Sequence, residues 1–171
     1  MAKREHLQIL LEGVNLWNQW REETKELPDL RHADLRGTNL KGANLQGARL
    51  AYADFHGADL SWANLTHAQC GWAEFGNAIL IGADCRHAFF AGADFRDANL
   101  SWADFREADL SWAYLGNAEL WRTFLSGARH LTIDQLLKVN NLHGAQLDKS
   151  LLKIIQKKSP HLLEKKTESS L

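Results

Sequence analysis

The sequence has few of the residues that hold small secreted proteins together or anchor membrane proteins. Its 171 residues include two cysteines, two prolines and one methionine, and two cysteines are too few for a disulfide framework. No apolar stretch reaches the length of about 18 residues that a membrane-spanning helix needs. Neither charge is in excess, because 20 Lys and Arg oppose 21 Asp and Glu. A net charge of −1 creates no global field that would attract nucleic acid or an anionic membrane.

The N-terminus shows no secretory signal, because Arg4, Glu5 and His6 are followed by too short an apolar run. We therefore expect a cytoplasmic protein. Reduced and buried thiols are the simpler interpretation of Cys70 and Cys85, and a disulfide between them is the alternative.

What the sequence does contain is a five-residue repeat that runs without a break from residue 28 to residue 127. A large apolar residue recurs at every fifth position from Leu30 to Leu125, as 13 Leu, 5 Phe and 2 Cys. The residue two positions earlier is Ala in 17 of the 20 repeats, the exceptions being Pro28, Thr38 and Thr123. This period fits neither a helix nor a strand, so the chain must turn a corner in every repeat to bury both residues.

A typical repeat reads Ala43-Asn44-Leu45-Gln46-Gly47 and resembles the pentapeptide repeat family. The resemblance implies an all-β solenoid, namely a right-handed quadrilateral β-helix whose 20 repeats make about five coils. At about 4.8 Å per coil, the shaft would be about 24 Å long. We expect helical caps at both ends, which divides the chain into an N-terminal cap at 1–27, the β-helix at 28–127 and a C-terminal cap with a disordered tail at 128–171.

Residues 3–26 are predicted to form two helices, which Gly13 should separate and Asn15 should help to cap. Apolar residues recur there at spacings of three and four: Leu7, Leu10, Leu11, Val14 and Trp17. The stretch from Gly13 to Arg21 is similar to the helical lead-in of many bacterial pentapeptide repeat proteins. Such a helix would cover the unpaired edge of the first coil, and a partner-binding helix is the alternative.

After the repeats, His130 stands where a large residue is due, and Leu131 takes that role one residue late. Residues 132–135 predict a capping box that opens a short helix to about Val139. A loop is expected at 142–147. A second helix should follow, with Asp148 as its cap and Ser159-Pro160 at its end. Its apolar side should consist of Leu151, Leu152, Ile154 and Ile155. We expect Thr167 to Leu171 to be disordered.

The corner of each repeat falls two residues after the large one. Glycine occupies that place in seven repeats, as a type II turn prefers at its positive-φ position. Because Trp disfavours positive φ, we expect a different turn geometry at four corners: Trp62, Trp72, Trp102 and Trp112.

Residues 20 apart should lie in one column along the shaft, and we name the four faces by their first large residues: the Leu30, Leu35, Leu40 and Leu45 faces. One column of the Leu35 face is acidic, with Arg36 and Arg96 beside it: Asp34, Asp54, Glu74 and Asp94. A solvated charged face is one interpretation. The other is mimicry of DNA, because family members that act on DNA gyrase resemble DNA in shape and charge. Those members are strongly acidic and dimerise through a bare terminal coil. This sequence is nearly neutral and is expected to be capped at both ends.

His67, His87 and Glu107 share a column of the Leu45 face, where imidazole and carboxylate are able to bind zinc. A solvated ladder is the alternative, and with three ligands in line we expect no metal. The sequence has no Ser/His/Asp arrangement, glycine-rich phosphate loop or Cys-x-x-Cys motif, and its acids belong to the repeat rather than to a cleft. We therefore expect neither catalysis nor a cofactor.

Contiguous apolar residues on an outward surface need an explanation. The Leu40 face carries five of them: Trp62, Ile79, Ile81, Trp102 and Trp121. Tyr52, Trp72 and Trp112 form a further corner column on the Leu30 face. These residues predict a non-enzymatic module that presents flat faces to a protein partner, as a monomer or a weak side-by-side dimer without direct binding to nucleic acid or membrane. The alternative is a DNA-mimicking regulator of DNA gyrase or another topoisomerase.

Overall fold

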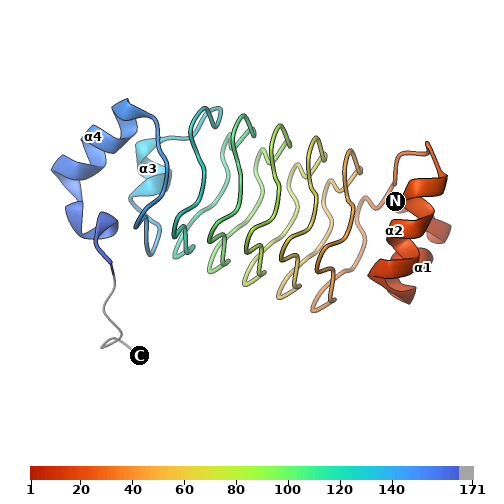
Figure 1. Ribbon diagram of the computed structural model, residues 1–171. Coiled ribbons are helices and arrows are strands. Elements are labelled where there is room, and N and C mark those ends of the chain that lie inside the picture. Colours follow the sequence, from red (N-terminus) through yellow and green to blue (C-terminus); the bar gives the residue numbers. More distant parts are fainter. Residues whose placement is uncertain (166–171) are drawn as a thin grey trace.

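The computed structural model describes residues 1–165, which form a shaft of stacked coils with helices at both ends (Figure 1). At the N-terminal end lie α1 (Arg4–Glu12) and α2 (Val14–Glu23). At the other end lie α3 (Ile133–Leu136), α4 (Lys149–Lys158) and the 3-10 helix η1 (Pro160–Leu163). Each of these helices, within residues 1–165, is too short and too polar to cross a bilayer.

The coils are held in register by parallel bridges between residues 20 apart, from Asp29–Arg49 to Asp109–Arg129. Each repeat hydrogen-bonds in both directions along the shaft. In one repeat, for example, Ile79 donates its N–H backward to the carbonyl of Ala58 at 2.9 Å, and Leu80 donates its N–H forward to the carbonyl of Asn99 at 2.8 Å. A turn follows every bridge, so backbone pairing in the described part of the chain consists of single-residue bridges instead of longer strands.

The two inward columns of each face form the core, as the repeat predicts. All 20 large residues from Leu30 to Leu125 are at most 2% exposed. The rings of Phe55, Phe75 and Phe95 stack along the shaft with centroids 4.8 and 4.9 Å apart. The two cysteines are buried and free, and burial raises the pKa of the Cys70 thiol.

The corners share one backbone conformation, whatever residue occupies them. All 20 corner residues have a positive φ, between 54° and 75°. The expectation of a different turn at four of them is therefore wrong, because φ is 61° at Trp62, 58° at Trp72, 63° at Trp102 and 54° at Trp112. Most corner N–H groups donate to the next coil, as from Trp62 to the carbonyl of Ile81 at 2.9 Å. The ladder thus imposes a conformation that costs a residue other than glycine about 1–2 kcal/mol.

Large corner side chains lie over the corner residue of the next coil. A Cβ on Gly82 would be 2.5 Å from ring carbons of Trp62, and a Cβ on Gly92 would be 2.6 Å from ring carbons of Trp72. The same position on Gly57 is open space. Glycine beneath a Trp therefore makes room for the indole, in addition to accepting positive φ.

The N-terminal helices bond to the edge of the first coil. The indole Nε1 of Trp17 donates to the carbonyl of Asn44 at 2.8 Å, and the side chain of Asn18 accepts from the N–H of Asn44 at 2.8 Å. Gly13 ends α1 as predicted, but Asn15 lies within α2 and does not cap it, since Gly13 itself is the N-cap residue. Leu11 is exposed and does not join the apolar side of α1.

Beyond the repeats, the predicted capping box of Thr132 and Gln135 is present and opens α3, which ends at Leu136, earlier than expected. Leu131 is buried and fills the large inward position that the repeat would otherwise place at His130. Asp148 precedes α4 but does not cap it, because its carboxylate accepts from the N–H of Gly127 at 3.1 Å.

The C-terminal segment corrects two further expectations. On the predicted apolar side of α4, Ile155 is buried whereas Ile154 is exposed. The loop expected at 142–147 is instead a further corner of the shaft, with Gly144 at φ 70° and bridges from Glu119 to Asn141 and from Phe124 to Gln146. The pairing offset there is 22 residues, so the repeat resumes two residues out of phase. The tail expected to be disordered, 167–171, lies outside the described residues.

Leu80→Asp is expected to prevent soluble folding, because Leu80 is fully buried and the new carboxylate would have no partner. Ile79→Asp is the matched control, since the adjacent Ile79 faces outward and is 39% exposed. Soluble expression and far-UV circular dichroism measure the result. A folded Leu80→Asp protein would contradict the inward assignment.

Gly82→Ala and Gly57→Ala separate two reasons for glycine at a corner, namely its positive φ and the room that it leaves for a neighbouring side chain. Both place Ala at φ 66°, which should cost about 1–2 kcal/mol in unfolding free energy. Gly82→Ala should cost about a further 1–3 kcal/mol, because its methyl group overlaps the Trp62 ring. Urea unfolding measures both, and Trp62→Gly should remove the excess in a double-mutant cycle. Equal costs for the two Ala variants would show that the indole moves aside freely.

Candidate protein-interaction surfaces

Four corners per coil place the Leu30 and Leu40 faces on opposite sides of the shaft, and likewise the Leu35 and Leu45 faces. The large exposed apolar side chains of the coils concentrate on the first pair. The second pair carries most of the ion pairs of the coils. The shaft therefore has two aromatic sides and two charged sides.

On the Leu40 face, the five predicted residues lie in neighbouring coils, and the backbone ladder joins two pairs of them. Trp62 donates its N–H to the carbonyl of Ile81, and Trp102 does the same to Trp121, each at 2.9 Å. Trp62 is 63% exposed, Ile79 is 39% exposed and Trp102 is 38% exposed, whereas Ile81 and Trp121 are half-buried. The structure thus brings the five together in one surface that contains three exposed side chains.

Arg122 was not among the five residues predicted for the patch. Its guanidinium carbon lies 4.7 Å from the ring centroid of Trp102 and 5.1 Å from that of Trp121. The two indoles meet edge to face, with centroids 5.3 Å apart. A cation between two aromatic rings is a favourable contact, so this end of the patch is held in place.

The opposite Leu30 face exposes a larger aromatic surface than the sequence indicated. Tyr52 is 54%, Trp72 is 50% and Trp112 is 76% exposed, in the corner column that was predicted. Phe89 is 45% exposed and was missed. Its ring lies over Gly71, where a Cβ would be 3.0 Å away. The signal was present, because Phe89 occupies a column that is otherwise polar, but the inward Phe90 beside it obscured the pattern.

The acidic column of the Leu35 face is present and is largely neutralised. Asp34, Asp54, Glu74 and Asp94 bridge one another in consecutive coils, followed by Tyr114. Arg36 lies 2.7 Å from the carboxylate of Asp34 and 3.4 Å from that of Asp54, and Arg96 lies 2.5 Å from that of Asp94. The Arg36 guanidinium lowers the pKa of Asp34 to about 2, and Arg96 lowers the pKa of Asp94. The column is therefore not an uncompensated track of negative charge.

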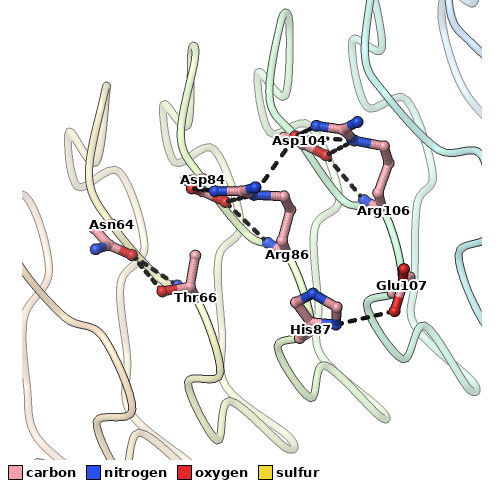
Figure 2. A network of polar contacts seen from close by, with 8 residues as sticks. All are labelled: Asn64, Thr66, Asp84, Arg86, His87, Asp104, Arg106 and Glu107. Carbon is pink, nitrogen blue, oxygen red and sulfur yellow. Dashed lines mark hydrogen bonds and ion pairs between the residues drawn. The ribbon is translucent and has the colours of Figure 1, made fainter.

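The Leu45 face carries a similar ladder, shown in Figure 2. Arg86 bonds to Asp84 at 2.6 Å and lies 3.8 Å from Asp104, which Arg106 binds at 2.5 Å. Hydrogen bonds from Arg86 lower the pKa of Asp84. The ions thus alternate along the face and pair within it.

The three residues considered as zinc ligands do line up in one column. The rings of His67 and His87 are stacked with centroids 5.0 Å apart, and Nδ1 of His87 lies 3.1 Å from the carboxylate of Glu107. Parallel rings stacked in this way direct their nitrogens outward side by side, not toward one point. No group of three His, Cys, Asp or Glu residues within the described chain is arranged to hold a metal ion.

Three comparisons bear on what this chain is. A family model described as pentapeptide repeats matches residues 29–66 and 73–111, with 8 copies. The comparison with curated proteins found no match.

Among solved structures, a trypsin-treated variant of QnrB1, a plasmid-mediated fluoroquinolone resistance protein, is similar at 23% identity with a TM-score of 0.62. The match covers 75% of this chain and 64% of that one. HetL from Nostoc sp. strain PCC 7120, involved in heterocyst differentiation regulation, is 29% identical, over 69% of this chain and 63% of that one, with a TM-score of 0.29. The pentapeptide repeat protein alr5209 from the same cyanobacterium is 25% identical over 77% and 91%, with a TM-score of 0.33. The chain thus spans less than two thirds of the first two proteins.

Pentapeptide repeat proteins fold as right-handed quadrilateral β-helices, and the match to QnrB1 supports that fold for this chain. The coil of 20 residues and its inward columns agree with it. Residues 29–66 and 73–111 of this chain are thus pentapeptide repeats.

Proposed function

We propose that this chain is a non-enzymatic interaction module that presents its Leu40 face to a partner protein. Pentapeptide repeat proteins are generally structural or interaction modules, not enzymes. The observation that carries the proposal is the row of exposed apolar side chains on a face whose other outward residues are polar: Trp62, Ile79 and Trp102, with Ile81 and Trp121 half-buried between them.

The arrangement around this row has the anatomy of an interface. Lys41, Asp59, Glu119 and Arg122 surround the apolar residues, as a polar rim surrounds an interface core. Trp and Arg are enriched among the residues that dominate binding energy. The stacking of Arg122 on Trp102 and of Trp62 on Gly82 holds these groups before a partner arrives, and such preorganisation lowers the entropic cost of binding.

Several finer expectations belong to the same proposal. The terminal helices act as caps of a β-helix of about five coils, with segments at 1–27, 28–127 and 128–171. The protein works in the cytoplasm as a monomer or a weak side-by-side dimer, and its partner is a protein, not nucleic acid or a membrane. The balanced net charge of −1 supports the last point, because it provides no attraction to a polyanion.

Ile79→Asn and Trp62→Gly should abolish partner binding without unfolding the protein. Both restore residues that the same columns already hold, Asn39 and Asn99 in one column and Gly42 and Gly82 in the other, so stability should change by about 0.5 kcal/mol or less for Ile79→Asn. Affinity capture from the source cell and sedimentation of the pure protein report binding and self-association.

Phe89→Asn is the matched control, because it removes an equally exposed apolar side chain from the opposite face. If Ile79→Asn and Trp62→Gly keep capture or self-association and Phe89→Asn loses it, the Leu30 face is the binding surface instead. Behaviour unchanged in all three folded variants would reject both faces.

The second candidate is a DNA-mimicking regulator of DNA gyrase or another topoisomerase. One observation favours it, the alignment of Asp34, Asp54, Glu74 and Asp94 in consecutive coils. The pairing of these acids with Arg36 and Arg96 weighs against it. We expect the purified protein to leave supercoiling by purified gyrase unchanged at micromolar concentration. Clear inhibition that Asp54→Asn and Glu74→Gln reduce would make mimicry the better function.

A further inference from the structure

The N-terminal edge of the first coil is covered on two of its faces. On the Leu45 side, the carbonyl of Gln46 accepts from Arg21 at 2.9 Å, and both backbone groups of Asn44 bond to α2. On the Leu30 side, Asp29 accepts from the N–H of Lys3 at 2.8 Å and donates to Nδ1 of His6 at 2.9 Å. These contacts replace the coil that is missing before the first one.

Between these faces, the helices reach the carbonyl of Gly42, which accepts from the side-chain amide of Asn18 at 3.0 Å. The remaining backbone groups there have no such cover within residues 1–165. In the second coil, Asp54 and Asp59 donate their N–H groups backward to the carbonyls of Ala33 and Thr38. Their first-coil counterparts, Asp34 and Asn39, have no acceptor for those N–H groups within residues 1–165. The carbonyls that would accept from a preceding coil are equally unpaired in the described chain: Asp34, Arg36, Asn39 and Lys41. An open strand edge of this kind is a template for another strand.

A groove runs beside this open edge. Its volume is about 640 Å³, and it lies between Asn39 and Lys41 on the coil and the junction of α1 with α2 on the other side. Leu16 contributes a side chain that is 44% exposed, and Val14 adds a half-buried one. Glu12 and Lys41 place one charge of each sign on the lining. Backbone donors and acceptors thus adjoin a wall to which α2 contributes the apolar side chains of Val14 and Leu16.

We propose that this edge binds a short extended peptide segment of another protein, which pairs with the backbone of Asn39 and Lys41 beside the groove. Peptide binding by strand addition draws affinity from main-chain hydrogen bonds and specificity from alternate side chains. Here the alternate side chains that face the helices would be apolar, because Leu16 and Val14 line that wall.

A single peptide fits this edge better than a second copy of the chain. The helices α1 and α2 stand at the end of the shaft (Figure 1), so a second shaft approaching end to end would bring its own helices against them. One added strand needs only about 4.8 Å along the shaft. The site does not use the exposed apolar residues of the Leu40 patch and shares Lys41 with its rim, so separate variants test the two sites.

The test selects a phage-displayed library of random linear peptides on the immobilised full chain. Enriched sequences should alternate apolar and polar residues, and a synthetic copy should bind in fluorescence anisotropy. N-methylation of alternate amides in that copy should abolish binding, because it removes the donors that pair with the edge carbonyls. Failure to enrich any peptide, or binding that N-methylation does not affect, overturns the proposal.

Asn39→Pro should weaken binding of the selected peptide by at least about fivefold, since it deletes one edge donor. Proline is tolerated where a strand N–H has no partner, so the thermal midpoint should be kept. Leu16→Lys should weaken binding by a similar factor through the apolar wall and supports the test if Asn39→Pro folds poorly. Ile154→Lys, at an equally exposed site on α4, is the control that should bind normally.

Two results would assign the edge differently. Peptide binding that is lost in Ile79→Asn but kept in Asn39→Pro and Leu16→Lys would place the peptide on the Leu40 face. A concentration-dependent dimer of the pure protein that Asn39→Pro abolishes would give the edge to a second copy. Either result rejects the proposed site, and the first would also support the Leu40 face as the binding surface.

Discussion

The rest of the structure depends on the hydrogen-bonded register of 20 residues between coils. A typical repeat donates two N–H groups forward and one backward along the shaft, as Leu80, Gly82 and Ile79 do, and a turn follows each bridge within the repeats. Because the coils superimpose in this register, side chains 20 apart stack at several corners. His32 stacks on Tyr52 and His67 on His87, each with centroids 5.0 Å apart and rings 5° from parallel. The register therefore decides both the core and the pattern of the surface.

The same register explains why glycine occurs at particular corners. Since His, Tyr, Trp, Arg and Glu adopt the same positive φ there, the backbone conformation alone does not explain where glycine stands. Gly82 lies beneath Trp62, Gly92 beneath Trp72 and Gly144 beneath Arg122, each with too little room for a Cβ. At these corners, glycine leaves room for the large side chain of the corner residue in the preceding coil.

Much of the fold was predictable from the period, and the failures have identifiable causes. The inward columns followed from Ala and Leu spacing alone. The corner at Trp62 was mispredicted because single-residue preference was applied where the ladder outweighs it. Residues 142–147 were mispredicted because the insertion of α3 shifts the repeat by two residues, although Ala145 still precedes Leu147 by two. The candidate surface was located by column, but the exposure of Ile81 and the contact of Arg122 depend on side-chain packing that a column does not contain.

The pairing of charges within faces explains why the aromatic faces are the better candidates for recognition. On the Leu35 and Leu45 faces, acids and arginines two residues apart satisfy each other, as in Asp84 with Arg86. A partner would have to break these pairs or desolvate them, and exposed pairs of this kind contribute little by themselves. Burying an indole that already rests on its neighbouring coil breaks no such pair and removes apolar surface from water. A rigid shaft that neutralises its own ions is thus suited to short-range contact through its apolar rows, not to long-range attraction of a polyion.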